Sequence, residues 1–248
     1  MAQELECRMG QVEQMIRYAY WNSGCAGIVV GVSGGVDSAL AAAFCCRAVG
    51  PDKVLGLSLP TAVSTPKDLI DAQDFCAGLG MEHRVISIDP MLAAFKTIPD
   101  FVETPYLLGN LMARIRMTVL YYHANRDHRL VCGTSNRSEA LLGYCTKYGD
   151  NAADLQPIIH LYKTDVYVMA KEMMIPAPIL NKTPSAGLWA GQSDEGEIGL
   201  SYAEIDMALK NLEANGWKAQ TPAEEKVLAR AEKNAHKRLP APSLLSVP

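Results

Sequence analysis

One short segment, GVSGGVDSAL at residues 31–40, has the residue types that bind phosphate. Its glycines leave the backbone free to turn sharply and to aim amide groups at an anion, and its serines add hydroxyl donors. The residues expected to face the anion are Gly31, Ser33, Gly34, Gly35, Val36 and Ser38. Because the segment runs from a predicted strand into a predicted helix, a bound anion would lie at the positive end of the helix dipole.

The same segment places an acid, Asp37, at the start of the helix and lacks the lysine of the GxxxxGK[ST] phosphate loop. An acid that faces phosphates implies a divalent cation between the two groups. An ordinary glycine-rich turn between a strand and a helix is the alternative interpretation. The combination of two serines, an aspartate and the strand–loop–helix context favours a phosphate site.

The elements that would position this segment follow from the apolar pattern. Short β-branched and apolar runs predict strands at residues 26–32, 53–59, 83–88 and 128–133. Helical periodicity predicts helices at residues 3–22, 38–49, 67–79, 108–125, 162–174, 202–214 and 222–237. Strands that are apolar throughout and alternate with helices are typical of a parallel sheet buried on both faces. We expect an α/β fold, a doubly wound and mainly parallel sheet with helices on both faces, in a single domain over residues 1–248.

Local signals refine this pattern at three places. Thr65 before Pro66 and Thr221 before Pro222 are N-cap signals, each with an acid three residues after the threonine. Residues 176–200 are rich in Pro, Gly and polar side chains, and a connection of this length within a domain is usually functional or mobile. We interpret this segment as a candidate lid, and we expect the final LPAPSLLSVP to dock or fray as a tail.

Composition argues against several classes of protein. The 248 residues carry a formal net charge of −4, so the bulk basic charge of a nucleic-acid binder is missing. There is no apolar run of membrane-spanning length, and the acidic N-terminus is unlike a signal peptide. The seven cysteines include no CxxC pair and the five histidines stand singly, which favours reduced thiols over a zinc site. We expect a cytoplasmic protein with neither a nucleic-acid partner nor a membrane.

Several blocks of the sequence resemble known proteins. SGGVDS at 33–38 resembles the pyrophosphate-binding loop of the N-type ATP pyrophosphatases, which adenylate a substrate and release pyrophosphate. Four further blocks resemble the NAD synthetase family along almost the whole chain. These are GTSNRSEALLGYCTKYGDNAADLQPIIHLYKTDV at 133–166, SLPTAVSTPKDLIDA at 58–72, GNLMARIRM at 109–117 and KTPSAGLWAGQSDEGEIGLSY at 182–202. The resemblance implies an adenine nucleotide alpha hydrolase-like fold.

The resemblance also implies a site for ATP and Mg²⁺. Asp37 and Glu139 would be the metal ligands, which agrees with the preference of Mg²⁺ for one or two carboxylates beside substrate phosphates. Lys163 would stabilise the reacting phosphate and the departing pyrophosphate. The alternative for Lys163 is a solvated lysine at a helix start. The implied ATP-binding residues are Gly31, Ser33, Gly34, Gly35, Val36, Asp37, Ser38, Thr134, Lys163 and Ser185.

In this family the second substrate, deamido-NAD, lies across a dimer interface, so a homodimer is implied. The matching positions are Asn110, Arg114, Arg116, Tyr121, Tyr144, Lys147, Asp150 and Asp154. Arg116 should point to a different helix face from Arg114, and an ion pair or a contact with the second subunit is its alternative role. For Tyr121 and Tyr144 the alternative to stacking on a flat ring is core packing.

The implied enzyme is a ligase that forms a carbon–nitrogen bond. It would convert deamido-NAD, ATP and ammonia to NAD, AMP and pyrophosphate through an acyl adenylate. Lys163 and Asp150 are the catalytic candidates, with Asp150 holding or deprotonating ammonium. The family motifs begin near residue 26, which leaves no room before them for the amidohydrolase domain of glutamine-using relatives. We therefore expect direct use of ammonia, unless a separate glutaminase subunit delivers it.

Two other functions are open from the sequence. One is a tRNA-modifying enzyme of the same superfamily, which would need a basic RNA-binding extension and usually catalytic or cluster-binding cysteines. The other is a nucleotide-binding sensor that has lost turnover. The intact acids and Lys163 argue against a sensor, and a single assay of AMP release with deamido-NAD would separate all three.

Overall fold

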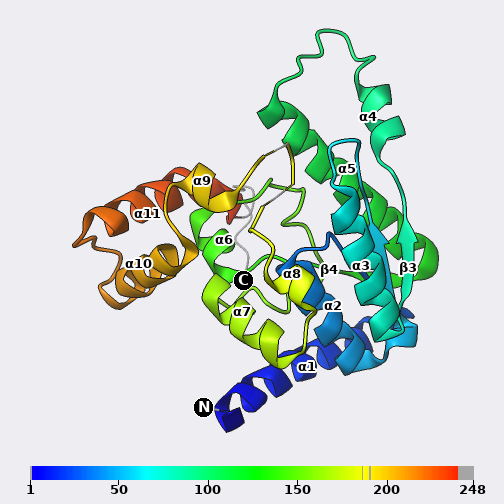
Figure 1. The fold of residues 1–248 in the computed structure, drawn as a ribbon, viewed down its shortest axis with the longest axis horizontal. Coiled ribbons are helices and arrows are strands. Elements are labelled where there is room, and N and C mark those ends of the chain that lie inside the picture. Colours follow the sequence, from blue (N-terminus) through cyan, green and yellow to red (C-terminus); the bar gives the residue numbers. More distant parts are fainter. Residues whose placement is uncertain (1, 186, 190, 240–248) are drawn as a thin grey trace, which may run out of the picture.

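A computed structural model describes residues 2–185, 187–189 and 191–239 of the chain. Its centre is a parallel sheet in the order β3-β2-β1-β4 (Figure 1). The strands are β1 (Gly27–Gly31), β2 (Val54–Ser58), β3 (Glu82–Val85) and β4 (Arg129–Cys132). All three pairings are parallel, with Val29 of β1 in register with Leu55 and Val131. The four predicted strands are therefore present in the expected kind of sheet.

Each strand is shorter than its predicted run, and β3 departs from the prediction most. The expected run 83–88 forms a strand only to Val85, although the amides of Ile86 and Ile88 still donate to Ser58 O (2.9 Å) and Pro60 O (3.0 Å). The chain then turns into a helix that begins at Asp89. The apolar residues after Val85 thus follow the end of β2 without forming regular strand.

The sheet also has a rudimentary extension beyond β4 that the apolar pattern did not indicate. Leu155 forms a parallel bridge with Cys132, and Gly133 N donates to Leu155 O at 2.8 Å. On the other side of this bridge, Asp154 N donates to Val131 O at 2.9 Å. The polypeptide therefore returns to the edge of β4 after the loop that carries residues 133–153.

The helices include all seven that periodicity predicted. The longer ones are α1 (Ala2–Ser23), α2 (Val36–Val49), α3 (Pro66–Leu79), α5 (Pro105–Asp127), α7 (Lys163–Glu172), α10 (Tyr202–Ala214) and α11 (Pro222–Lys233). The short ones are α4 (Asp89–Phe95), α6 (Arg137–Leu142), α8 (Ala177–Leu180) and α9 (Asp194–Ile198). Pro51–Lys53 and Ala235–Lys237 form 3-10 turns. The predicted helix 222–237 therefore ends early, and a separate turn follows it.

Helices cover both faces of the sheet. On one face α1, α2, α3, α7 and α8 pack on the strand side chains that point to that side, such as Ile28 and Val30. Phe44 of α2 is fully buried there. On the other face α5 and α4 pack on the alternate strand residues, including Val29 and Leu55. The alternation of side chains along each strand explains why neighbouring residues enter different cores. The predicted doubly wound α/β fold is confirmed.

A third apolar cluster lies beside the main body, where α6, α10 and α11 meet (Figure 1). Ile205, Leu209 and Leu212 of α10 are fully buried there against Leu142 at the end of α6 and Val227 of α11. This cluster also reaches Tyr162, the residue before α7. The helix pair α10–α11 is thereby attached to α6 and to the start of α7, which carry Glu139 and Lys163.

The candidate lid, residues 176–200, contains α8 and α9 joined by irregular chain, and residues 186 and 190 lie outside the described part. Lys182 pairs with Asp68 of α3 at 2.8 Å, which attaches the segment to the body near the phosphate loop. Of the predicted tail, residues 240–248 also lie outside the description. Within the described residues, no helix is long and apolar enough to span a membrane. All seven cysteines are free thiols.

Candidate active site

The site lies at the carboxyl ends of β1 and β4. The chain crosses from β1 to β2 on one side and returns to β4 on the other, so the strand order reverses between β1 and β4. Ligands of open α/β sheets bind in the crevice at such a switch point. The loop after β1 carries the predicted phosphate-binding residues, and the loop after β4 leads into α6 with Glu139. The topology therefore brings two distant motifs to one edge of the sheet.

The phosphate loop has a backbone that only glycine fits comfortably. Gly34 has φ +75°, and a Cβ there would lie 2.5 Å from the carbonyl oxygen of Asp68 in α3. Ser38 Oγ donates to Gly35 O at 2.9 Å and accepts from Ser33 N at 3.2 Å, which closes the loop on itself. Gly35, the residue before α2, has no side chain that could cap the helix. The loop thus presents backbone amides and the start of a helix to an anion.

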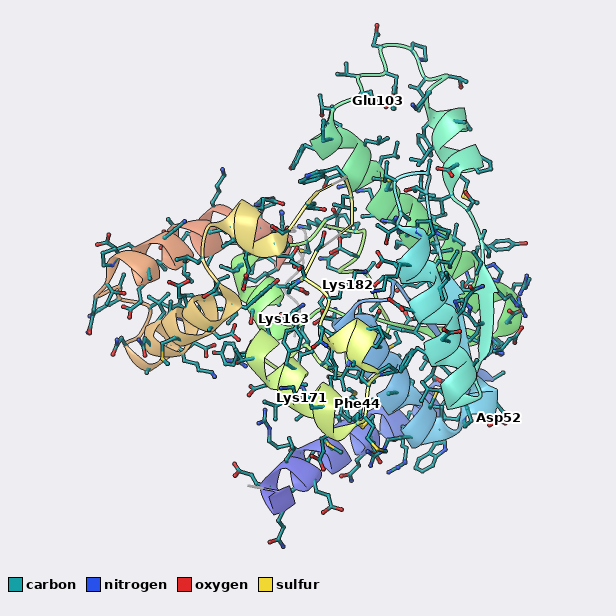
Figure 2. All side chains as sticks on the ribbon, in the orientation of Figure 1. Phe44, Asp52, Glu103, Lys163, Lys171 and Lys182 are labelled. Atoms are coloured by element: carbon teal, nitrogen blue, oxygen red, sulfur yellow. The ribbon has the colours of Figure 1, made fainter. Side chains whose placement is uncertain are left out.

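Lys163 is the centre of the cluster that faces this loop. It is the first residue of α7 and only 2% exposed, whereas Lys171 lies farther along the same helix (Figure 2). Lys163 Nζ donates to Asp37 Oδ2 at 2.5 Å and lies 3.6 Å from Glu139 Oε1. Asn136 Nδ2 donates to the other oxygen of Asp37 at 2.9 Å. The alternative of a solvated lysine is therefore wrong, because the ammonium group joins the loops after β1 and β4.

The electrostatics of the cluster agree with a cation position between two acids. Burial and the negative charge of Asp37 raise the pKa of Glu139, Lys163 opposes both effects, and the net result is a pKa of about 8. Burial disfavours the charge of Lys163, yet the carboxylates of Asp37 and Glu139 outweigh burial and raise the pKa of Lys163. The lysine is therefore fully protonated at neutral pH. The single positive charge of Lys163 thus pairs with the carboxylates of both Asp37 and Glu139.

The same two carboxylates fit a magnesium ion. Mg²⁺ usually takes one or two protein carboxylates and completes its shell with substrate phosphates and water. Asp37 and Glu139 approach one common nitrogen atom, so a cation between them would contact both. No group of three or more His, Cys, Asp or Glu able to hold a metal occurs in the described part of the chain. A Mg²⁺ ion bound by two carboxylates would complete its shell with oxygen atoms of substrate phosphates and water.

Sequence reasoning missed one acid at this site, Asp194 of α9. Its residue is buried, and the hydroxyls of Tyr202 and Tyr144 donate to its carboxylate at 3.0 and 3.2 Å. Burial raises the pKa of Asp194, and the nearby charge of Lys163 lowers it. The ring of Tyr202 lies 5.0 Å from Lys163 Nζ. The end of the candidate lid is thus part of the same cluster.

Asn136 was also missed, although its sequence carried a signal. Its side chain accepts from Glu139 N at 3.0 Å, while Glu139 Oε2 accepts from Asn136 N at 3.3 Å. This reciprocal pair is a capping box, and Asn-x-x-Glu is its sequence pattern. The box fixes Glu139 at the start of α6 while Asn136 reaches Asp37. No comparable signal marked Asp194, which lies in a Gly-rich and polar segment.

Two ATP-site candidates make fewer contacts. Thr134 is half-buried in the loop after β4, two residues before Asn136. Ser185 is exposed in the candidate lid, where its Oγ accepts from Gly187 N at 3.1 Å. The structure therefore brings Asp37, Glu139 and Lys163 into one cluster, while the phosphate role of Ser185 stays a prediction.

The residues predicted to bind deamido-NAD lie on α5 and in the chain that follows α6. Arg114 is exposed and its Nη2 donates to Lys147 O at 3.2 Å, while Asn110 Nδ2 donates to Tyr106 O at 2.8 Å on the same helix. Arg116 is half-buried, and its Nε donates to Leu59 O at 3.1 Å. The two arginines thus have different surroundings, as their spacing predicted. Lys147 Nζ donates to His236 O at 2.6 Å and Leu239 O at 3.2 Å, so the C-terminal turn packs on this loop.

Asp150 lies close to Arg116. Its Oδ1 accepts from Thr146 N at 2.7 Å, and the charge of Asp150 acts on the Arg116 guanidinium. The residue is exposed at the surface, but the protein around its carboxyl group desolvates it and raises the pKa of Asp150. A carboxyl group in such a setting can exchange a proton more readily near neutral pH than an ordinary aspartate.

Tyr121 and Asp154 make a contact that supports the sheet edge. Asp154 Oδ2 accepts from Val131 N at 2.7 Å, and its other oxygen accepts from Tyr121 OH at 3.2 Å. Burial and the charge of Asp154 together raise the pKa of Tyr121 to about 12. Tyr144 likewise bonds to acids, Asp194 and Glu197, the second at 2.9 Å. Both rings also pack against apolar clusters, Tyr121 beside the α5 face of the sheet and Tyr144 beside α10 and α11, which agrees with their core-packing alternative. A substrate role for either tyrosine stays a prediction.

The fold and site together define a class. A doubly wound sheet presents a glycine-rich phosphate loop without the lysine of the GxxxxGK[ST] pattern. Asp37 follows this loop on α2, and Glu139 and the buried Lys163 face it from the chain after β4. These features are those of the ATP pyrophosphatase type predicted from the sequence. Residues 9–241 match the family model described as NAD synthase. The chain belongs to the NAD synthase family.

Individual relatives agree with this assignment. The chain is 86% identical over 248 residues, 100% of each chain, to the NH(3)-dependent NAD(+) synthetase of Methanoregula boonei. Among solved structures, the NMN synthetase from Francisella tularensis aligns with a TM-score of 0.88 and 35% identity over 96% of this chain and 98% of that one. The NH3-dependent NAD synthetase from Campylobacter jejuni subsp. jejuni aligns with a TM-score of 0.83 and 36% identity over 98% and 99%. The predicted family is confirmed.

Proposed function

We propose that this chain joins ammonia to the nicotinate carboxylate of deamido-NAD, with Asp37, Glu139 and Lys163 as its ATP-cleaving centre. The reaction is the known function of the family, and the predicted reaction and enzyme class, a ligase that forms a carbon–nitrogen bond, are confirmed. The observation that carries the residue assignment is the buried Lys163 Nζ between two carboxylates from the starts of different helices, α2 and α6.

The chemistry has two stages. The nicotinate carboxylate attacks the α-phosphorus of ATP and forms an acyl adenylate with release of pyrophosphate, and ammonia then displaces AMP. Asp37 and Glu139 would hold Mg²⁺, which when bound would neutralise negative charge on the phosphates. Lys163 exchanges its contact with Asp37 for the phosphates and stabilises the departing pyrophosphate. The amides of residues 33–36 orient the phosphate chain, so the protein acts mainly by positioning and by charge.

Water must be kept from the acyl adenylate, because hydrolysis would waste it. The candidate lid supports this role, since Lys182 pairs with Asp68 at one end and Asp194 bonds to Tyr144 and Tyr202 at the other. The described parts of this segment are therefore attached to the body of the protein at Lys182 and at Asp194. We propose that this segment excludes water during adenylation.

Asp150 is proposed to hold the incoming ammonium. Its raised pKa and its position near Arg116 and the deamido-NAD candidates support the assignment. Free ammonia is the proposed nitrogen source, and a separate glutaminase subunit is a possible supplier. The purified chain should form NAD with ammonium chloride, whereas efficient turnover with glutamine and no added ammonium would refute the ammonia-dependent reading.

The homodimer is a further part of the proposal. Exposed apolar side chains gather at the start of α5 and on the chain that leads to it, at Ile98, Val102, Tyr106 and Leu107. Exposed apolar side chains that cluster in this way are typical of interfaces. The chain mass is 26.9 kDa, so light scattering should report about twice this value, as expected for the commonest oligomeric symmetry. A fully active monomer at low concentration would contradict a homodimer.

A cytoplasmic location is also proposed, since all seven cysteines are free.

One comparison favours a second substrate. The Francisella tularensis neighbour is an NMN synthetase, and its product by name is a mononucleotide. The direct test compares kcat/KM for deamido-NAD with kcat/KM for nicotinate mononucleotide at saturating ATP and ammonium. We expect a preference for deamido-NAD of at least about tenfold, because the additional adenylate half adds binding contacts. A preference for the mononucleotide would replace the proposed substrate but would leave the proposed ATP chemistry intact.

A further inference from the structure

The start of α7 is buried and depends on residues from two other helices. The residue before the helix, Tyr162, provides no side-chain cap. Instead Lys163 N donates to Ser138 Oγ of α6 at 2.9 Å, and Thr164 N donates to Asp206 Oδ2 of α10 at 2.8 Å. Ser138 Oγ in turn donates to the other oxygen of Asp206. One carboxylate therefore caps α7, directly and through a serine.

The carboxylate of Asp206 does not serve to cap or stabilise its own helix, α10. It is only 1% exposed, and burying a carboxylate is costly unless its oxygens are bonded. The start of α10 is already capped by a reciprocal pair between Ser201 and Glu204. The partners of Asp206 lie outside α10, on Ser138 and Thr164, and the helix dipole of α7 adds to the stabilisation of its charge.

The bonds of Asp206 connect the two backbones that carry the ATP-cleaving residues. Ser138 precedes Glu139 on α6, and Lys163 begins α7 beside Thr164. The contact of 3.6 Å between Lys163 Nζ and Glu139 Oε1 depends on how α6 and α7 sit relative to each other. Because Asp206 bonds to both helices, it limits their movement.

We propose that Asp206 is a positioning residue for the adenylation step, which it serves by fixing Lys163 relative to Glu139 through Ser138 and Thr164. The inference rests on the proposed roles of Lys163 and Glu139. Asp206 does not touch the reacting atoms. Loss of its charge should let the start of α7 move, and displacements of about 1 Å at a reacting centre can cost on the order of 100-fold in rate.

A merely structural role is the competing explanation, and the chain offers a matched control. Glu224 is also buried, at 3% exposure, and lies in the same apolar region of α10 and α11. Its two oxygens accept from Asn211 Nδ2 of α10 at 3.0 Å and from Gln220 N, in the connection before α11, at 2.7 Å. These bonds hold α11 to α10 and to the chain between them. Glu224→Gln should therefore lower stability without moving α6 relative to α7.

The experiment compares Asp206→Asn and Ser138→Ala with Glu224→Gln in the full chain. Thermal unfolding gives the stability of each variant, and kcat, KM for ATP and the rate of ATP–pyrophosphate exchange with deamido-NAD are measured at a temperature where each is folded. We expect Asp206→Asn to lower kcat and exchange together by about tenfold or more. Glu224→Gln should keep kcat within about twofold at a comparable loss of stability.

Ser138 supplies a milder test should Asp206→Asn not fold. Ser138→Ala removes the hydroxyl that accepts from Lys163 N and donates to Asp206, and Ser138→Thr keeps a hydroxyl at this position. The alanine variant should lose exchange activity that the threonine variant retains. Full kcat in both Asp206→Asn and Ser138→Ala, with stability alone reduced, would overturn the inference. Lys163→Met is assayed alongside, since turnover in that variant would instead refute the proposed function.

Discussion

The Lys163→Met variant tests the electrostatics of the site most sharply. Methionine keeps an apolar stem of similar length and removes only the ammonium group. Asp37 and Glu139 then face each other without a cation, at a place where Lys163 Nζ had contacted them at 2.5 and 3.6 Å. We expect the unliganded variant to be clearly less stable than the wild type.

The magnitude follows from the burial of the three groups. The side chain of Lys163 is 3% exposed and the two carboxylates are 19% exposed each, so water can replace little of the lost interaction. Removing one partner of a buried ion pair typically costs about 3–5 kcal/mol. For a chain of this size, that loss corresponds to a fall in Tm of about 6–20 °C.

The pH dependence of the loss identifies its origin. The pKa of Lys163 is raised in the folded state, so its stabilisation is fully present below its unfolded pKa and does not change between mildly acidic and neutral pH. The pKa of Glu139 is raised to about 8, and an acid with a raised folded pKa destabilises the fold as pH rises above its unfolded value. Without the lysine this penalty grows. The difference in free energy of unfolding between variant and wild type should therefore be largest near pH 8 and smaller near pH 5. These values are about the folded and the unfolded pKa of Glu139.

The assay is thermal unfolding of both proteins across this pH range, without ATP or Mg²⁺. Lys171→Met is the matched control, because Lys171 lies on the same helix and is exposed. The control should change the free energy of unfolding by less than about 0.5 kcal/mol. The reasoning fails if Lys163→Met is as stable as Lys171→Met, or if its loss of stability is the same at pH 5 and pH 8.

Three other predictions concern the reaction. Gly34→Ala places a Cβ 2.5 Å from Asp68 O at φ +75°, so KM for ATP should rise by about tenfold or more, and an unchanged KM would contradict the loop assignment. Asp37→Asn and Glu139→Gln should lose most turnover while remaining folded, and near-wild-type activity at limiting Mg²⁺ in either would remove that residue from the metal site. The KM for total ammonium should fall nearly tenfold per pH unit above pH 7 if free NH₃ binds, and a constant KM would indicate capture of NH₄⁺ by Asp150.

The sheet and the longer helices could be predicted because their signals are local. Strands buried on both faces are apolar throughout, and each of the four predicted runs overlaps an observed strand. The cap signals were equally local, since Thr65 and Thr221 accept from Asp68 N at 3.4 Å and Glu224 N at 3.3 Å. The short helices α4, α6, α8 and α9 were not predicted, because segments of four to seven residues do not establish a helical period.

Asp37, Glu139 and Lys163 were predicted from the sequence, but the arrangement that brings them together was not. Asp37 and Lys163 are 126 residues apart in sequence, and only the reversal of strand order places them together. The burial of Lys163 could not be deduced from its position at a helix start, where a solvated lysine was equally consistent. Asp206 gave no signal at all, because its partners are a serine on α6 and a backbone amide of α7.

The most direct test of the central claim is the identity of the products. The purified chain is incubated with ATP, Mg²⁺, deamido-NAD and ammonium chloride, and the nucleotides are separated by chromatography. The proposed function predicts NAD and AMP in equal amounts, with pyrophosphate, and no NAD when deamido-NAD is omitted. Formation of ADP and phosphate instead would contradict cleavage between the α- and β-phosphates, and with it the assignment of this site.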